Sequence, residues 1–92
     1  DAARAVTNDL KRTDTLLVMV GERKDECGGS VYYQLHNELG ANVPKPDLAQ
    51  FGAEVHAVSY VIQQNLVIAA HDISDGGIAV ALAEMSFKNN IG

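Results

Sequence analysis

The chain has 92 residues, of which 47% are hydrophobic and 21% charged, a composition typical of one small soluble globular domain. Twelve acidic against seven basic residues give a net charge of -5 without any basic run, which argues against a nucleic-acid partner. The longest apolar stretches, residues 15–20 and 66–70, are too short to span a membrane, and we expect a cytoplasmic protein. A chain of this length buries one core at most, so its stability needs a covering neighbour.

Two further features bear on its setting. The single cysteine, Cys27, cannot form an internal disulfide, which agrees with a reducing compartment. The sequence starts without a methionine and stops directly after a helical pattern, so we expect residues 1–92 to be one piece of a larger protein.

The first half of the chain predicts a strand followed by a helix. Residues 2–10 form either a short helix or an extended arm. Residues 15–20 are continuously apolar and partly β-branched, which predicts a strand covered on both faces. Within residues 30–39 apolar side chains recur at helical spacing, with Ser30 able to cap the start and Gly40 the end.

The second half predicts a helix, a strand and a helix. Asp47 can cap a helix whose apolar residues fall on one stripe: Leu48, Phe51, Val55, Val58 and Ile62. Residues 66–70 predict a second strand, and residues 78–85 a last helix that ends near residues 88–90.

The predicted order is therefore strand, helix, helix, strand, helix, which is an α/β pattern. Two strands do not make an independently stable sheet, since roughly three or more are normally needed. We therefore expect further strands from sequence outside this chain or from a second copy, and self-association of the isolated chain.

Two loops carry a predicted strand into a predicted helix, and each has a functional and a structural interpretation. Paired glycines and a helix N-terminus make a chemically plausible phosphate seat, or simply a tight turn with a capped helix. The candidate residues of the first loop are Gly28, Gly29 and Ser30. Those of the second loop are His71, Asp72, Asp75, Gly76 and Gly77.

The charges favour the first loop as the phosphate seat. Asp72 and Asp75 would repel a phosphate, and they suit a metal-bridged contact, or capping of the helix by Ser74 or Asp75. We therefore predict that a bulky residue at position 29 weakens nucleotide or substrate binding in the full enzyme, whereas Asp75→Asn chiefly lowers stability.

The histidines and the cysteine suggest no catalytic centre. The three histidines lie far apart without metal-ligand spacing, and one cysteine cannot complete a zinc site. Cys27 lacks an evident base and is interpreted as a small, half-buried side chain.

Four segments, in this order, resemble the synthetase-subunit family of phosphoribosylformylglycinamidine synthase, within the aminoimidazole ribonucleotide synthetase superfamily. They are residues 5–11 and 16–21, residues 25–33, and residues 70–85, the last reading Ala-His-Asp-Ile-Ser-Asp-Gly-Gly-Ile-Ala-Val-Ala-Leu-Ala-Glu-Met. The resemblance covers nearly the whole chain and implies the start of a C-terminal-type domain. Cys27 departs from it, since the family commonly has Leu there.

The resemblance implies a purine-biosynthesis ligase that uses ATP, with magnesium, to convert formylglycinamide ribonucleotide and ammonia into the amidine. It also implies three partners: the remainder of the synthetase subunit, a glutaminase subunit that supplies the ammonia, and a small accessory subunit. The family's catalytic His, ATP-clamping residues and metal motif lie upstream of the matching segment. We therefore assign no catalytic or metal-ligating residue here and expect the isolated chain to be inactive and cofactor-free.

Two alternatives remain open. The segment is a structural or assembly module that holds a non-catalytic nucleotide or docks partner subunits, or it belongs to a superfamily member with another substrate. The sequence of residues 71–85 favours the phosphoribosylformylglycinamidine synthase family over the other members of the superfamily.

Overall fold

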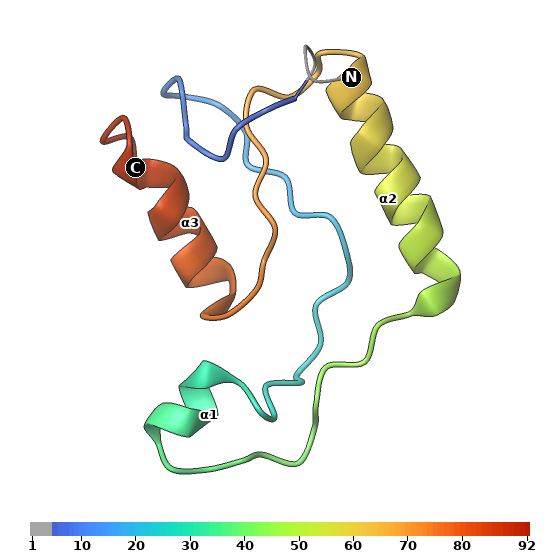
Figure 1. Cartoon of the computed structure of the whole chain (residues 1–92), viewed down its shortest axis with the longest axis vertical. Helices are drawn as coiled ribbons and strands as arrows, with labels where there is room; N and C mark the ends of the chain where they lie inside the picture. The colour runs from blue at the N-terminus through green and yellow to red at the C-terminus, as the bar shows by residue number, and fades with distance from the viewer. Residues whose placement is uncertain (1–4) are drawn as a thin grey trace.

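The computed structural model describes residues 5–92, and its regular elements are three helices: α1 (Val31–Leu35), α2 (Leu48–Gln63) and α3 (Gly77–Phe87). Figure 1 shows α2 and α3 on opposite sides of the molecule and α1 at its lower end, joined by long extended connections. The helices hardly touch one another. Extended chain, rather than helix packing, therefore fills the middle of the fold.

Two of the helices begin where the sequence predicts. The Asp47 carboxylate accepts hydrogen bonds from the N–H groups of Ala49, at 3.0 Å, and Gln50, at 3.3 Å, so it caps α2. The Ser30 hydroxyl oxygen accepts from the Tyr33 N–H at 3.3 Å and caps α1. Both predicted caps are confirmed.

The end of α1 differs from the prediction. The helix stops at Leu35, well before the predicted boundary at Leu39. Asn37 takes a φ of 55°, and the N–H of Glu38 turns back to the Tyr33 carbonyl at 2.9 Å. A left-handed residue followed by such a backward bond is a usual helix C-terminus, and Asn tolerates this conformation.

The predicted strands, and with them the α/β fold, are wrong for the part of the chain that the structure describes. Residues 5–92 contain no strand. Residues 15–20 form no backbone hydrogen bond with another described residue, and Ala70 forms one, from its N–H to the Thr7 carbonyl at 3.2 Å. A strand requires a ladder of such bonds with a neighbour, which an apolar run by itself cannot supply.

Very little of the chain is buried. Ala81 and Met85 are the buried apolar residues of the described part, whereas Leu16 is 93% and Leu48 79% exposed. The accessible surface is 7602 Å², against about 5,200 Å² expected for a folded monomer of this mass. The radius of gyration is 15.2 Å, against about 12 Å for a compact domain of this length. Within the apolar stripe of α2, Leu48, Phe51 and Val55 are exposed, whereas Val58 and Ile62 are half-buried.

The N-terminal segment is held against α3. Residues 5–10 contain no helix, whereas residues 2–4 of the predicted helix or arm lie outside the described residues. The Leu10 N–H donates to the Met85 carbonyl at 2.8 Å and so satisfies a carbonyl near the C-terminus of α3. None of the helices in residues 5–92 has the length and apolar character needed to cross a membrane.

Candidate functional site

The first predicted loop is closed by its own backbone. The N–H groups of Gly28, Gly29 and Ser30 donate to the carbonyls of Asn42, Leu39 and Cys27, at 2.8, 2.6 and 3.1 Å. These three donors are therefore not directed at a ligand in this conformation. The phosphate seat at this loop stays a prediction, and it requires these bonds to be exchanged.

Gly28 is needed here because backbone meets backbone. A Cβ at position 28 would lie 2.9 Å from the carbonyl carbon and oxygen of Asn42. Close approach was the predicted use of a glycine in this loop, but the approaching group is protein rather than a ligand. The neighbouring Gly29 has a φ of +70° and open space around it. Cys27 is exposed, so its predicted half-buried position is wrong.

The second predicted loop leaves its helix uncapped by side chains. The capping position of α3 is held by Gly76, with a φ of 88°, and no side chain hydrogen-bonds to the first turn. The predicted caps Ser74 and Asp75 are therefore wrong; the Ser74 carbonyl instead accepts from the Gly77 N–H at 3.0 Å. Since Gly76 has no side chain, the first amides of α3 keep the partial positive charge of a helix N-terminus.

His71 lies between two carboxylates. Its Nε2 is 2.6 Å from Glu84 Oε2, on α3, and its Nδ1 is 3.1 Å from Asp72 Oδ1. The hydrogen bond to Glu84, followed by that to Asp72, raises the pKa of the imidazole, while partial burial opposes the rise. Asp72 thus contacts its neighbour in the loop.

The two loops do not form one polar site. No hydrogen bond or ion pair joins residues 27–30 to residues 71–77 in the described part of the chain. Across residues 5–92, no three His, Cys, Asp or Glu side chains are arranged to hold a metal ion. The described geometry thus offers two separate polar loops and no complete catalytic constellation.

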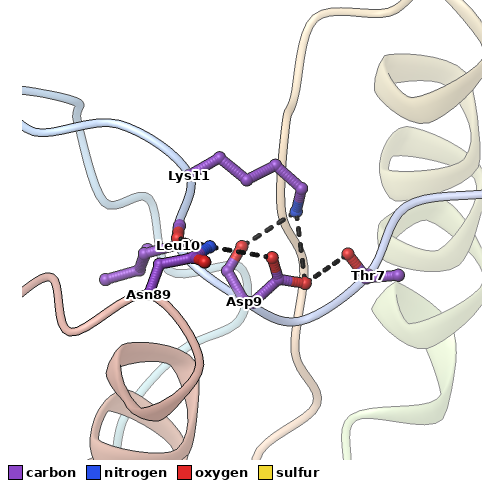
Figure 2. Close-up of polar contacts among 5 residues, drawn as sticks. All are labelled: Thr7, Asp9, Leu10, Lys11 and Asn89. Atoms are coloured by element: carbon purple, nitrogen blue, oxygen red, sulfur yellow. Dashed lines mark hydrogen bonds and ion pairs between the residues drawn. The ribbon is translucent and has the colours of Figure 1, made fainter.

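A third polar cluster, which the sequence did not predict, surrounds Asp9 (Figure 2). Asp9 is 6% exposed. The Thr7 hydroxyl donates to its Oδ1, Lys11 Nζ lies 3.6 Å from the same oxygen, and the Asn89 amide donates to Oδ2 at 3.2 Å. The hydrogen bond from Thr7 is the main cause that holds the pKa of the Asp9 carboxyl below its ordinary value.

The Asp9 cluster joins the two ends of the chain. Asn89 also donates to the Leu10 carbonyl at 2.8 Å, and Lys11 Nζ donates to the Asp9 carbonyl at 2.8 Å. Each oxygen atom of Asp9 thereby meets a donor, which fits a structural role for the cluster. Residues 5–11 resemble the family in sequence, which draws attention to this segment. The partner Asn89, however, lies 80 positions from Asp9 along the chain, and no local sequence pattern points to it.

A shallow depression of about 330 Å³ lies elsewhere, between residues 21–26 and 44–54. The Lys45 N–H closes one side of it by donating to Glu26 Oε2 at 2.9 Å. Its lining mixes four acidic with two basic side chains, and although it includes the start of the first loop, it contains none of the candidate residues of either loop. We therefore do not regard it as the candidate site.

The sequence of the chain is similar to those of several known proteins. The chain is 44% identical over 86 residues to phosphoribosylformylglycinamidine synthase subunit PurL of Methanocaldococcus jannaschii, covering 92% of this chain and 12% of the relative. It is 42% identical over 84 residues to subunit PurL of Symbiobacterium thermophilum, covering 90% of this chain and 11% of that one. It is 39% identical to subunit PurL of Methanothrix thermoacetophila over 100% of this chain and 12% of the relative.

The chain thus spans about an eighth of these relatives, with 12% coverage of the first. No solved structure matches it. The family model for the AIR synthase related protein, C-terminal domain, matches residues 12–92, which include both loops and all three described helices. The chain therefore belongs to the AIR synthase related protein C-terminal domain family.

Proposed function

We propose that the chain is part of a phosphoribosylformylglycinamidine synthase and contributes to ATP-dependent amidation in purine biosynthesis. The observation that carries this proposal is its 44% identity to a PurL subunit over 92% of the chain. The segment at residues 70–85, with its two glycines and uncapped helix, belongs to the matched region. We place the protein in the cytoplasm, together with the rest of the synthetase, a glutaminase subunit and a small accessory subunit.

The proposed reaction activates an amide oxygen. Transfer of the terminal phosphoryl group of ATP to the amide oxygen of formylglycinamide ribonucleotide releases ADP and turns that oxygen into a good leaving group. The nitrogen of ammonia then forms a bond to the amide carbon. The bond from that carbon to the phosphorylated oxygen breaks, and phosphate departs to leave the amidine. Mg²⁺, when bound with ATP, would neutralise phosphate charge. Its ligands are not assigned to residues of this chain.

The chain's proposed contribution is to line or support the ligand cleft with its two glycine-containing loops. The second loop has the more accessible donors, because the first turn of α3 has no side-chain cap and its N-terminus favours negative charge. The first loop keeps its donors bonded to Leu39, Asn42 and Cys27. We therefore rank the loop at residues 71–77 above that at residues 28–30 as the ligand-facing segment.

A segment exchange tests the proposal. The corresponding segment of the Methanocaldococcus jannaschii subunit is replaced by this chain, and amidine and ADP formation are measured with ATP, Mg²⁺, formylglycinamide ribonucleotide and ammonia. We expect the hybrid to retain activity, whereas a control lacking the segment is inactive. A folded hybrid without turnover, beside an active parent, would contradict the proposed function.

The isolated chain is expected to show no turnover in the same assay. Its described residues provide no metal cluster and no joined catalytic set. The measurement is ADP and amidine release by the purified chain against a protein-free control. Turnover above that control would show that the chain carries a complete active site.

We also propose that the isolated chain associates with itself. Its surface exceeds the expectation for a folded monomer of this mass by about 2,400 Å². An excess of this size is comparable to what an obligate interface buries. Sedimentation should reveal dimers or larger species. A compact monomer at high concentration would contradict the proposal.

A further inference from the structure

The His71 ring can donate hydrogen bonds to two ionised carboxylates at the same time only when it is protonated. A neutral imidazole has one N–H donor and one acceptor nitrogen, whereas ionised carboxylates accept hydrogen bonds and donate none. Both ring nitrogens face carboxylate oxygens, Nε2 at 2.6 Å from Glu84 and Nδ1 at 3.1 Å from Asp72. With both carboxylates ionised, the observed geometry therefore needs an imidazolium that donates on both sides.

We propose that protonated His71 is a clasp that fastens the loop at residues 71–76 to α3, with Glu84 as its positioning residue, and that deprotonation opens it. Glu84 lies 13 residues further along the chain, on the helix that the loop enters. The His71 side chain is 11% exposed, so its bonds are partly sheltered from competing water. The clasp thus positions the loop at residues 71–76 against α3 through a side-chain hydrogen bond.

The surrounding charges all favour the closed state. From its own loop His71 faces Asp72, and from α3 it faces Glu84, both of which favour the protonated ring. The segment at residues 5–11 also lies nearby, since the Ala70 N–H bonds to the Thr7 carbonyl. Its charged residues Asp9 and Lys11 pair with each other, and the groups that raise the pKa of His71 are Glu84 and Asp72.

The sign of the pH dependence follows from these contacts. The folded pKa of His71 is raised, so the clasp is fully formed below the pKa of an unfolded histidine, about 6.5. Its contribution is lost as pH rises through the higher folded value. The loop should therefore be more firmly held in slightly acidic than in alkaline solution.

The clasp is tested by ring titration and by loop exchange. The chain, labelled with ¹³C in its histidines, is titrated by NMR as wild type, Glu84→Gln and Asp72→Asn, and the His71 signal is assigned by its loss in His71→Gln. Glu84→Gln keeps size and an acceptor oxygen but removes the charge. We expect a downward shift of the His71 midpoint in both variants, larger for Glu84→Gln because that bond is the shorter.

Hydrogen exchange of residues 71–77 provides the second readout. Protection factors should fall in Glu84→Gln, and in wild type they should fall as pH rises through the His71 midpoint. Asp75→Asn is the matched control, since Asp75 shares the loop but does not contact His71, and it should leave both readouts unchanged. An unshifted midpoint in Glu84→Gln, or equal protection of the loop in that variant and wild type, would overturn the clasp.

Discussion

The loops at residues 27–30 and 71–77 use similar residues for different purposes. In the first, Gly28 allows the chain to meet the Asn42 backbone, and the amides of residues 28–30 each have a carbonyl partner. In the second, Gly76 takes a left-handed conformation that starts α3 without a side-chain cap. In the described conformation the first loop therefore keeps its amides bonded within the chain, whereas the second presents helix amides and a histidine clasp.

The largest expected effect concerns the closed loop. Gly28→Ala should lower the free energy of unfolding by about 3 kcal/mol, because its Cβ meets backbone that no side-chain rotation can move. Gly29→Ala is the matched control: its neighbourhood is open, and its φ of +70° costs about 1 kcal/mol. Urea denaturation followed by circular dichroism measures both. Equal losses would mean that the contact with Asn42 is absent.

The start of α3 should be nearly as sensitive. Gly76→Ala is expected to cost about 2 kcal/mol, from the left-handed backbone together with a Cβ that would overlap Val80 Cγ2. The cost stays below that of Gly28→Ala because the Val80 side chain can move. Gly77→Ala, with φ +70° and no obstructing atom, should cost about 1 kcal/mol. A Gly76→Ala variant as stable as wild type would place the start of α3 elsewhere.

A smaller loss of stability should distinguish the capped start of α1 from the uncapped start of α3. Ser30→Ala should cost about 0.5–1 kcal/mol, the lower part of the range for lost caps, since the Tyr33 N–H lies 3.3 Å from the hydroxyl. Asp75→Ala removes no cap and should change stability by less than about 0.5 kcal/mol. Thermal unfolding of the two variants measures these two losses of stability. A larger loss for Asp75→Ala would restore the capping role that the sequence predicted.

The last effect is a pH-dependent one and is expected for Asp9→Asn, outside both loops. The amide oxygen can still accept from Thr7, but the amide nitrogen then faces the Asn89 donor and the charge beside Lys11 is lost. Because the folded pKa of Asp9 is lowered, its contribution to stability is present above about pH 3.9 and is lost as pH falls through the folded value. Melting temperatures across that range should show this component in wild type and not in Asp9→Asn. Parallel profiles would exclude it.

Much of the helical structure was predictable because its signals are local. The Asp47 and Ser30 caps act on amides within three residues, so both were found correctly. The family was likewise recognisable from short ordered segments, including residues 70–85, and the family match confirms it. The end of α1 was missed because the chain already takes the left-handed conformation at Asn37, three residues before Gly40.

The sequence by itself determined the family and the starts of α1 and α2, and it marked the two polar loops as candidates. Only the tertiary structure decided whether the apolar segments at residues 15–20 and 66–70 become strands, because a strand needs a partner whose position no local pattern encodes. It also decided which carboxylate meets His71 and which side chain meets Asp9. Glu84 and Asn89 lie 13 and 80 positions away, and only the path of the chain brings them into contact.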